Sequence, residues 1–362
     1  MSGKVSDNLG RSSGLTKAAS TGDPTAEAGD PAVDRDESVG TRYINTTSGE
    51  LFICTDATAG ENIWKGQLGS TVEPASSWGA RGVFAAGAGA GGNQNVMDYV
   101  TISSPGNATD FGNLSSSREN QGSGLSSGTR IVWGGGNGDA MDYIIVASLG
   151  DVTDFGNLTS SRTHVTGLSN GTRGVFGGGA SDDTMDYITI ATTGNATDFG
   201  NMTESNNRRA STSNNTRGVF AGGSGRVDTI DYITIASLGN ATDFGNLTSG
   251  KNSLSGCTDG TKAVFGGGDN DATGDLDEIE YVNITSLGNA TDFGNLYGGA
   301  YASSGSCGNG TVGLWGGGYR NTGAITSDVI HAVNVASTGD ATDFGNLSVA
   351  RYNMSGASGD AS

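Results

Sequence analysis

The chain is poor in the residues on which many enzymes and disulfide-rich domains depend. Its 362 residues include only 4 Pro, 3 Cys and 2 His. Three scattered cysteines exclude a disulfide framework and a zinc site, so Cys54, Cys257 and Cys307 are expected to be small buried thiols. The two histidines, His164 and His331, are isolated and offer no general acid/base constellation.

Positive charge and long apolar runs are scarce as well. Lys and Arg total 19 against 38 Asp and Glu, and the resulting net charge of −19 argues against a nucleic-acid partner. No segment approaches the roughly 18 consecutive apolar residues of a membrane span. The opening MSGKVSDNLG lacks the apolar core of a secretory signal. The sequence predicts a protein made in a cytoplasm that does not insert into a membrane.

Glycine, by contrast, is abundant and occurs in a repeat. Gly accounts for 64 residues, and the phrase TDFGN occurs six times at spacings of 44 to 51 residues. Periods of this length are typical of propellers, solenoids and arrays. DFG is also the magnesium motif of protein kinases, but six copies without a glycine-loop lysine favour a strand-forming phrase. GAGAGG at 87–92 is not followed by a helix, which argues against a phosphate-binding loop.

Each repeat divides into four strand-like segments. A small-residue stretch such as TGLSNG (166–171) precedes a hydrophobic strand with a glycine run, such as RGVFGGG (173–179). A β-branched strand such as MDYITI (185–190) follows, and a Gly-Asn or Gly-Asp pair is expected to form a two-residue hairpin turn before TDFGN. Four antiparallel strands per repeat predict an all-β, six-bladed β-propeller of four-stranded antiparallel blades. A β-solenoid is the alternative.

The end of the chain indicates how such a ring would close. After the sixth TDFGNL, residues 348–362 resume the first-strand pattern without a hydrophobic second strand. Residues 352–359 are therefore predicted to pair beside 80–86 and to complete the first blade. The segment PASSW (74–78) competes for the same place.

One carboxylate recurs in each of five repeats. These residues are predicted to hydrogen-bond turns or to pair with the cation that begins each second strand. The carboxylates are Asp98, Asp142, Asp186, Asp231 and Glu280, and the cations are Arg81, Arg130, Arg173, Arg217 and Lys262. No acid stands out from its counterparts, so we expect no catalytic, cofactor-binding or metal-ligating residue and no enzyme activity.

A single acidic loop leaves an alternative open. In DNDATGDLDEIE (269–280), oxygen-bearing side chains stand at positions 1, 3, 5, 9 and 12, and Gly274 stands at position 6. This is the spacing of a twelve-residue calcium loop, although a strand rather than a helix follows. The other interpretation is a solvated acidic loop.

Composition divides the chain into three parts. Residues 1–38 are hydrophilic and predict an extended docking arm. Residues 39–70 predict a small β-hairpin module, with strands near 42–45 and 51–55 and a third apolar anchor at Ile63-Trp64. Residues 71–362 hold the predicted propeller.

The repeats resemble the kelch family. The order of small strand, hydrophobic strand with Gly-Gly, DY-containing strand and aromatic residue before Leu and Arg is similar to a kelch repeat over residues 79–352. The arginines concerned are Arg118, Arg162 and Arg351. The resemblance implies blade architecture and, as one alternative function, a protein-binding scaffold.

The stretch before the repeats resembles a different family. GTRYINTTSGELFICTDATAGENIWKG (40–66), with GRSSG (10–14), is similar to modules of bacteriophage tail fibres and other virion proteins. This implies a non-enzymatic tail fibre, spike or capsid-surface fibre, made in the host cytoplasm and carried on the virion. Its arm would bind other virion proteins, its propeller a host surface glycan or receptor, and similar fibres are homotrimers. A polysaccharide-active propeller enzyme is a further alternative.

The loops after the glycine runs differ most between repeats. Seven residues separate Trp133 from Met141, whereas fourteen separate Trp315 from Ile330. Loops of unequal length on one face of a rigid scaffold are the expected place for recognition.

Overall fold

The chain folds into two all-β units. The computed structural model describes residues 24–28, 30–31, 35, 37–57, 62–67, 71–72, 78–118, 122–136, 138–179, 182–270, 272, 274–299, 301–320 and 323–360. Every helix or strand assigned within these ranges is a β-strand, which confirms the all-β prediction. No helix in these ranges could span a membrane. The units are Met1–Pro74 and Ala75–Ser362, and most of the predicted arm lies outside the described residues.

The first unit is a sheet in the order β1-β2-β3-β4-β5. Its strands are β1 (Thr25–Glu27), β2 (Arg42–Asn45), β3 (Leu51–Asp56), β4 (Ile63–Gly66) and β5 (Thr71–Val72). The predicted hairpin of β2 and β3 is confirmed. A small core forms from Tyr43, Phe52, Cys54 and Trp64. Strand β1 falls within the predicted arm but pairs parallel with β2, so this part of the arm belongs to the sheet.

The second unit consists mainly of six antiparallel sheets, here numbered 1 to 6 in chain order. Sheet 1 contains β10 (Thr109–Asn113), β9 (Val96–Thr101), β6 (Arg81–Ala85), β34 (Ser355–Gly359) and the short parallel β11 (Gly122–Ser123). Sheet 2 contains β12 (Leu125–Ser126), β13 (Arg130–Gly134), β14 (Gly138–Ile145) and β15 (Thr153–Arg162). Sheet 3 contains β16 (Thr166–Ser169), β17 (Arg173–Gly177), β18 (Thr184–Thr189) and β19 (Thr197–Asn201).

The remaining sheets repeat this order. Sheet 4 contains β20 (Ala210–Ser213), β21 (Arg217–Ala221), β22 (Thr229–Thr234) and β23 (Thr242–Asn246). Sheet 5 contains β24 (Ser255–Thr258), β25 (Lys262–Gly266), β28 (Glu278–Asn283) and β29 (Thr291–Asn295). Sheet 6 contains β30 (Gly305–Gly308), β31 (Val312–Arg320), β32 (Ile325–Asn334) and β33 (Thr342–Asn346). Two small hairpins, β7 (Ala88–Gly89) with β8 (Gly92–Asn93) and β26 (Asp269–Asn270) with β27 (Gly274–Asp275), occupy loops.

The two ends of the repeat region meet in sheet 1. Strand β34 pairs antiparallel with β6, so that Ser355 lies opposite Ala85 and Gly359 opposite Arg81. This confirms the predicted pairing of residues 352–359 with 80–86. Residues 74–77 of the competing segment lie outside the described residues, and Trp78 is in no strand.

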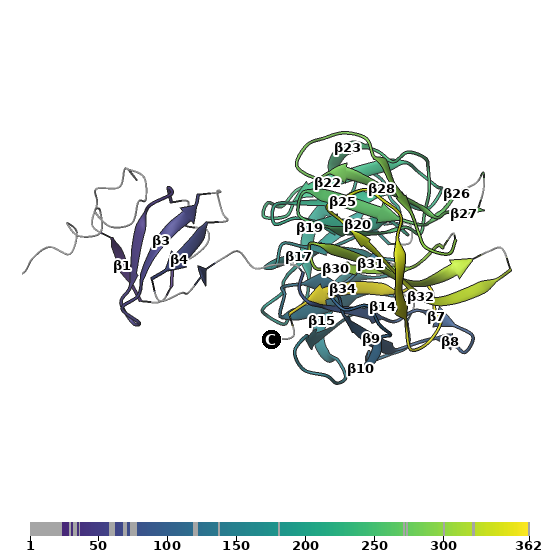
Figure 1. Ribbon diagram of the computed structural model, residues 1–362, viewed down its shortest axis with the longest axis horizontal. Helices are drawn as coiled ribbons and strands as arrows, with labels where there is room; N and C mark the ends of the chain where they lie inside the picture. Colours follow the sequence, from purple (N-terminus) through teal and green to yellow (C-terminus); the bar gives the residue numbers. More distant parts are fainter. Residues whose placement is uncertain are drawn as a thin grey trace, which may run out of the picture. The chain divides into compact units, whose positions relative to one another are not determined.

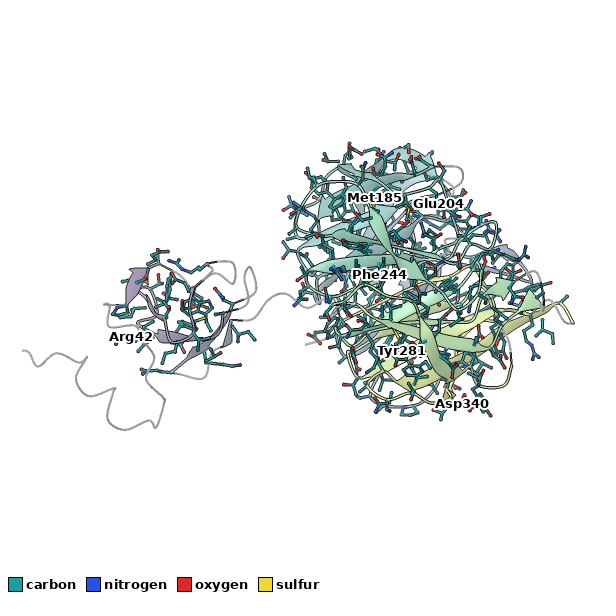
Figure 2. All side chains as sticks on the ribbon, turned by 90° about the horizontal axis from the view of Figure 1, so that it is seen from above. Arg42, Met185, Glu204, Phe244, Tyr281 and Asp340 are labelled. Carbon is teal, nitrogen blue, oxygen red and sulfur yellow. The ribbon has the colours of Figure 1, made fainter. Side chains whose placement is uncertain are left out.

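Apolar side chains fill the space between consecutive sheets. One cluster joins Val83 and Phe111 of sheet 1 to Ile131 and Trp133 of sheet 2. Four more join the following neighbours, and a sixth joins Leu314 and Phe344 of sheet 6 back to sheet 1. Burial on both faces explains why the third strands are almost continuously apolar. Phe244 of β23, labelled in Figure 2, is one of these buried side chains.

The Gly-Asn and Gly-Asp pairs bind the neighbouring sheet, and the prediction that they form two-residue hairpin turns is wrong. In sheet 2 the chain turns at residues 145–148, and Gly150 then donates from its N to Phe111 O of sheet 1 at 2.8 Å. Asp151 accepts from Asn113 N with Oδ1 at 2.9 Å. This contact occurs at all six junctions between neighbouring sheets, including the junction of sheets 6 and 1. The six donor glycines are Gly106, Gly150, Gly194, Gly239, Gly288 and Gly339.

This contact accounts for much of the TDFGN phrase. Its Phe is buried between sheets, and its Asn backbone meets the neighbouring Asx side chain. Its Gly stands where the neighbouring loop approaches: a Cβ on Gly156 would lie 2.4 Å from Gly194 O, and its φ is +139°. An edge strand with unpaired backbone groups would invite aggregation. In this fold the loop of the next sheet covers that edge.

Candidate functional site

The loops after the second strands and the segments leading from one sheet to the next lie together, and we call this edge of the second unit the loop face. Each second strand ends in two residues of positive φ, such as Gly178 and Gly179. The second of these donates to the connecting segment, as Gly179 N does to Asn206 O at 3.1 Å. The hairpins β7–β8 and β26–β27 and the ends of β31 and β32 project on this face (Figure 1).

Buried ion pairs lie beneath the loop face. Arg162, the last residue of β15 in sheet 2, binds Asp186 of sheet 3, and both side chains are almost completely buried. The hydroxyl and N–H of Thr159 complete the shell of this carboxylate at 2.6 and 3.0 Å. The equivalent pairs are Arg118 with Asp142, Arg209 with Asp231, Lys251 with Glu280 and Arg351 with Asp98. Buried carboxylates held in this way link neighbouring sheets and are inaccessible to a substrate.

The predicted pairing of these carboxylates with the cations that begin the second strands is therefore wrong. The alternative prediction, hydrogen bonds to turns, holds for Asp142, which accepts from Ser115 N in the bend after β10 at 3.2 Å. Arg173, which begins a second strand, stacks on Tyr187 with 4.7 Å between its Cζ and the ring centroid. Its Nη1 donates to Ile235 O of the next sheet at 3.0 Å. Strand register explains the difference: Arg173 lies opposite Thr189, whereas Asp186 lies opposite Phe176, farther along the hairpin.

Sheet 6 departs from this pattern. His331 occupies the place of the carboxylate, and its ring centroid lies 5.0 Å from that of Tyr301. His331 is completely buried, and no described residue hydrogen-bonds to Nδ1 or Nε2. Burial lowers its pKa from 6.5 to about 4. The imidazole is consequently neutral at pH 7.

This lowered pKa predicts a loss of stability in acid. The unfolded chain takes up a proton on His331 below pH 6.5, while the folded chain resists protonation until about pH 4. Stability is therefore full above pH 6.5 and falls as the pH decreases. Relative to His331→Leu, the wild type should lose roughly 3 kcal/mol between pH 7 and pH 4. Urea unfolding at each pH measures this difference, because carboxylate titration common to both proteins cancels.

A variant that keeps both histidines provides the control. Tyr297→Ala removes a side chain that is 47% exposed, so it is expected to keep the wild-type pH dependence. Equal pH profiles for the wild type and His331→Leu would contradict a neutral buried imidazole.

Aromatic side chains gather on the loop face where sheets 6 and 1 meet. Tyr319, near the end of β31, and Tyr352, in the segment leading to β34, lie with ring centroids 5.2 Å apart. Backbone bridges tie Tyr352 to Ala88 and Tyr319 to Ala302. Both tyrosines are partly exposed, and Arg320, the next residue of β31, lies with its Cζ 5.5 Å from the centroid of the Tyr301 ring. We call Tyr319, Arg320 and Tyr352 the tyrosine cluster.

Two of the candidate calcium ligands in the acidic loop at 269–280 are paired with cations. Asp269 forms an ion pair with Arg226 at 2.7 Å, and Glu280 is buried against Lys251 at 2.6 Å. Residues 269–270 and 274–275 form the β26–β27 hairpin. No group of three potential metal ligands occurs among the described residues, while residues 271 and 273 lie outside them.

The centre of the six sheets holds only a narrow cavity. Small residues of the innermost strands line a volume of about 70 Å³, enough for a few water molecules. Hydroxyls of its lining residues bond between sheets, as when Ser213 donates to Ser169 O at 2.7 Å. Cys257 and Cys307 lie here as buried free thiols on adjacent inner strands, as predicted, and burial raises the pKa of both.

The sequence predicted the loop face but not the tyrosine cluster. Tyr319 and Arg320 lie in the long stretch between Trp315 and Ile330, where the unequal loop lengths predict recognition. Tyr352 was missed because it belongs to a segment more than 30 residues later. The available signal was its place in residues 352–359, the segment predicted to complete sheet 1. No family model matches the chain, and no curated protein matches it significantly in sequence.

Proposed function

We propose that the six sheets are the blades of a closed six-bladed β-propeller, and that this propeller is a non-enzymatic recognition module displayed on a phage virion. The closure is supported by the cyclic contacts between sheets, including Gly106 N with Phe344 O at 2.7 Å. The virion assignment rests on the resemblance of residues 40–66 to tail-fibre modules.

The tyrosine cluster is the observation that carries the recognition function. Carbohydrate rings bind against flat aromatic faces, while neighbouring polar groups bind their hydroxyls. Tyr319 and Tyr352 offer two such rings on backbone that is bridged to its neighbours, and Arg320 adds hydrogen-bond donors. A weak site of this kind gains avidity when many copies are displayed together.

The course of the chain agrees with display of this face. Trp78, which precedes the first strand of the second unit, packs against Gly260 and Gly310. Both glycines lie in turns between first and second strands, at the opposite ends of the strands from the loop face. Trp78 therefore lies on the side of the second unit away from the tyrosine cluster.

A glycan array tests the recognition function. Full-length protein, clustered to restore multivalency, should bind surface polysaccharides of the host, and Tyr319→Ala/Tyr352→Ala should weaken binding at least about tenfold. Tyr297→Ala is the control, since this tyrosine is 47% exposed and lies outside the cluster. Equal binding by the double variant and the wild type would contradict the proposed site. Turnover of the polysaccharide would favour the enzyme alternative.

Labelling of purified phage particles tests the location separately. An antibody against the second unit should decorate intact particles, and mass spectrometry should find the chain among their proteins. If the chain is absent from particles but binds a protein partner, the kelch-like scaffold replaces the virion assignment.

A further inference from the structure

A pocket of about 400 Å³ lies at the seam between sheets 6 and 1, at the ends of the strands opposite the loop face. We call it the seam pocket. Val312, Ala332 and Phe344 of sheet 6 line one side, and Ile102 and Pro105 of sheet 1 line the other. Asp340 stands at the rim, at the periphery of the second unit (Figure 2). This volume is within the range of small-molecule sites.

The other five junctions show what is missing from this one. At each, a cation at the start of the second strand donates to a main-chain carbonyl of the next sheet. Arg130 Nη1, for example, lies 2.8 Å from Ile190 O, and its Cζ lies 4.4 Å from the centroid of the Tyr143 ring. The five cations are Arg81, Arg130, Arg173, Arg217 and Lys262.

Sheet 6 replaces both partners with small apolar residues. Strand register places Val312 where the cation stands and Ala332 where the tyrosine stands. Val312 cannot donate to the carbonyl of Ile102, which corresponds to Ile190 O, and Phe344 loses the edge contact that Tyr143 makes with Phe155 at 6.0 Å. The pocket is the space that an aromatic ring and a planar cation fill elsewhere in the same protein.

We propose that the seam pocket binds a small organic cation in which an aromatic ring carries an amidinium or guanidinium group. The ring takes the place of the missing tyrosine beside Phe344. The cation takes the place of the missing guanidinium and donates to Ile102 O, while Asp340 of the lining, whose Oδ1 accepts from Asn295 of sheet 5, adds a negative charge to the site. Arg217 provides an internal precedent for a cation near this phenylalanine position, at 5.8 Å from the Phe244 ring.

Benzamidine is the probe, and benzamide is its neutral counterpart of the same shape. In ligand-observed NMR and calorimetry on the full chain, benzamidine should bind with a dissociation constant on the order of 1 mM. Benzamide should bind at least about tenfold more weakly, because it lacks the charge. No saturable benzamidine binding at about 10 mM, or equal binding of the two probes, would overturn the proposal.

Two variants locate the site. Val312→Arg/Ala332→Tyr restores the internal pair and should abolish binding, whereas Val349→Arg adds the same charge at an exposed valine and should not. Arg130→Val/Tyr143→Ala should open an equivalent pocket between sheets 2 and 3 and raise the stoichiometry from one to two. Unchanged binding by Val312→Arg/Ala332→Tyr, or an unchanged stoichiometry in a folded Arg130→Val/Tyr143→Ala protein, would contradict it.

Discussion

Truncation after Leu347 is expected to lower the melting temperature of the second unit by about 10–20 °C, or to abolish its cooperative unfolding. The deletion removes β34, which pairs with β6 in the middle of sheet 1. It also removes Arg351, the only described cation paired with the buried Asp98, and Met354, a completely buried core residue. An uncompensated buried charge costs about 3–5 kcal/mol, and loss of a buried Met about 2–5 kcal/mol.

Calorimetry of the truncated chain and of a control that lacks only residues 361–362 measures this effect. The control retains all of β34 and should melt with the wild type. A synthetic peptide of residues 348–362 should restore part of the lost melting temperature, because it can occupy the empty strand position. An unchanged melt after truncation would show that β34 does not hold the second unit together.

The strands and the joining of the two ends could be predicted because they depend on local pattern. Six β-branched third strands and six glycine runs recur in the same order, so each copy reinforces the assignment of the others. The orphan first-strand pattern at 348–362 had one remaining place, beside 80–86. Backbone pairing of this kind follows from composition and order alone.

The contacts between sheets could not be predicted, since they depend on geometry that the repeat does not encode. Arg130 is the cation closest in sequence to Asp142, but register places it opposite Ile145, at the other end of the hairpin. Arg118, in the preceding repeat, binds the carboxylate instead. Gly150 was likewise assigned to a turn on local propensity, whereas its N–H binds Phe111 O of the neighbouring sheet.

Departures from the repeat proved the most informative positions for sites. Val312, Ala332 and His331 are visible in the sequence as substitutions at otherwise regular places. What these substitutions do could not be predicted, because it also depends on residues of neighbouring sheets. They leave a pocket between sheets 6 and 1 and a neutral pair of His331 with Tyr301. Strand β1 could not be predicted for a different reason. Its sequence, TAE, has no apolar pattern, and it belongs to the sheet because its backbone pairs with β2.

Substitution of Asp186 with Ala is expected to destabilise the second unit by about 3–5 kcal/mol, because Arg162 would keep its charge in a buried site without a partner. Asp198→Ala is the matched control. Asp198 lies directly opposite Asp186 on the next strand but is exposed, so its loss should change the melting temperature by no more than about 1–2 °C. Denaturant unfolding of both variants distinguishes the cost of leaving Arg162 buried without a partner from the cost of any Asp-to-Ala substitution in strand β18 or β19.

Removal of both charges should cost much less than removal of one. In Arg162→Met/Asp186→Leu no buried ion remains, and apolar pairs of similar volume often replace buried ion pairs at little cost or with a gain. Sheet 6 is a natural instance, because the neutral His331 and Tyr301 occupy the same place. If the double variant is as unstable as Asp186→Ala, the hydrogen bonds from Thr159 to the carboxylate stabilise this junction more than the pairing of charge does.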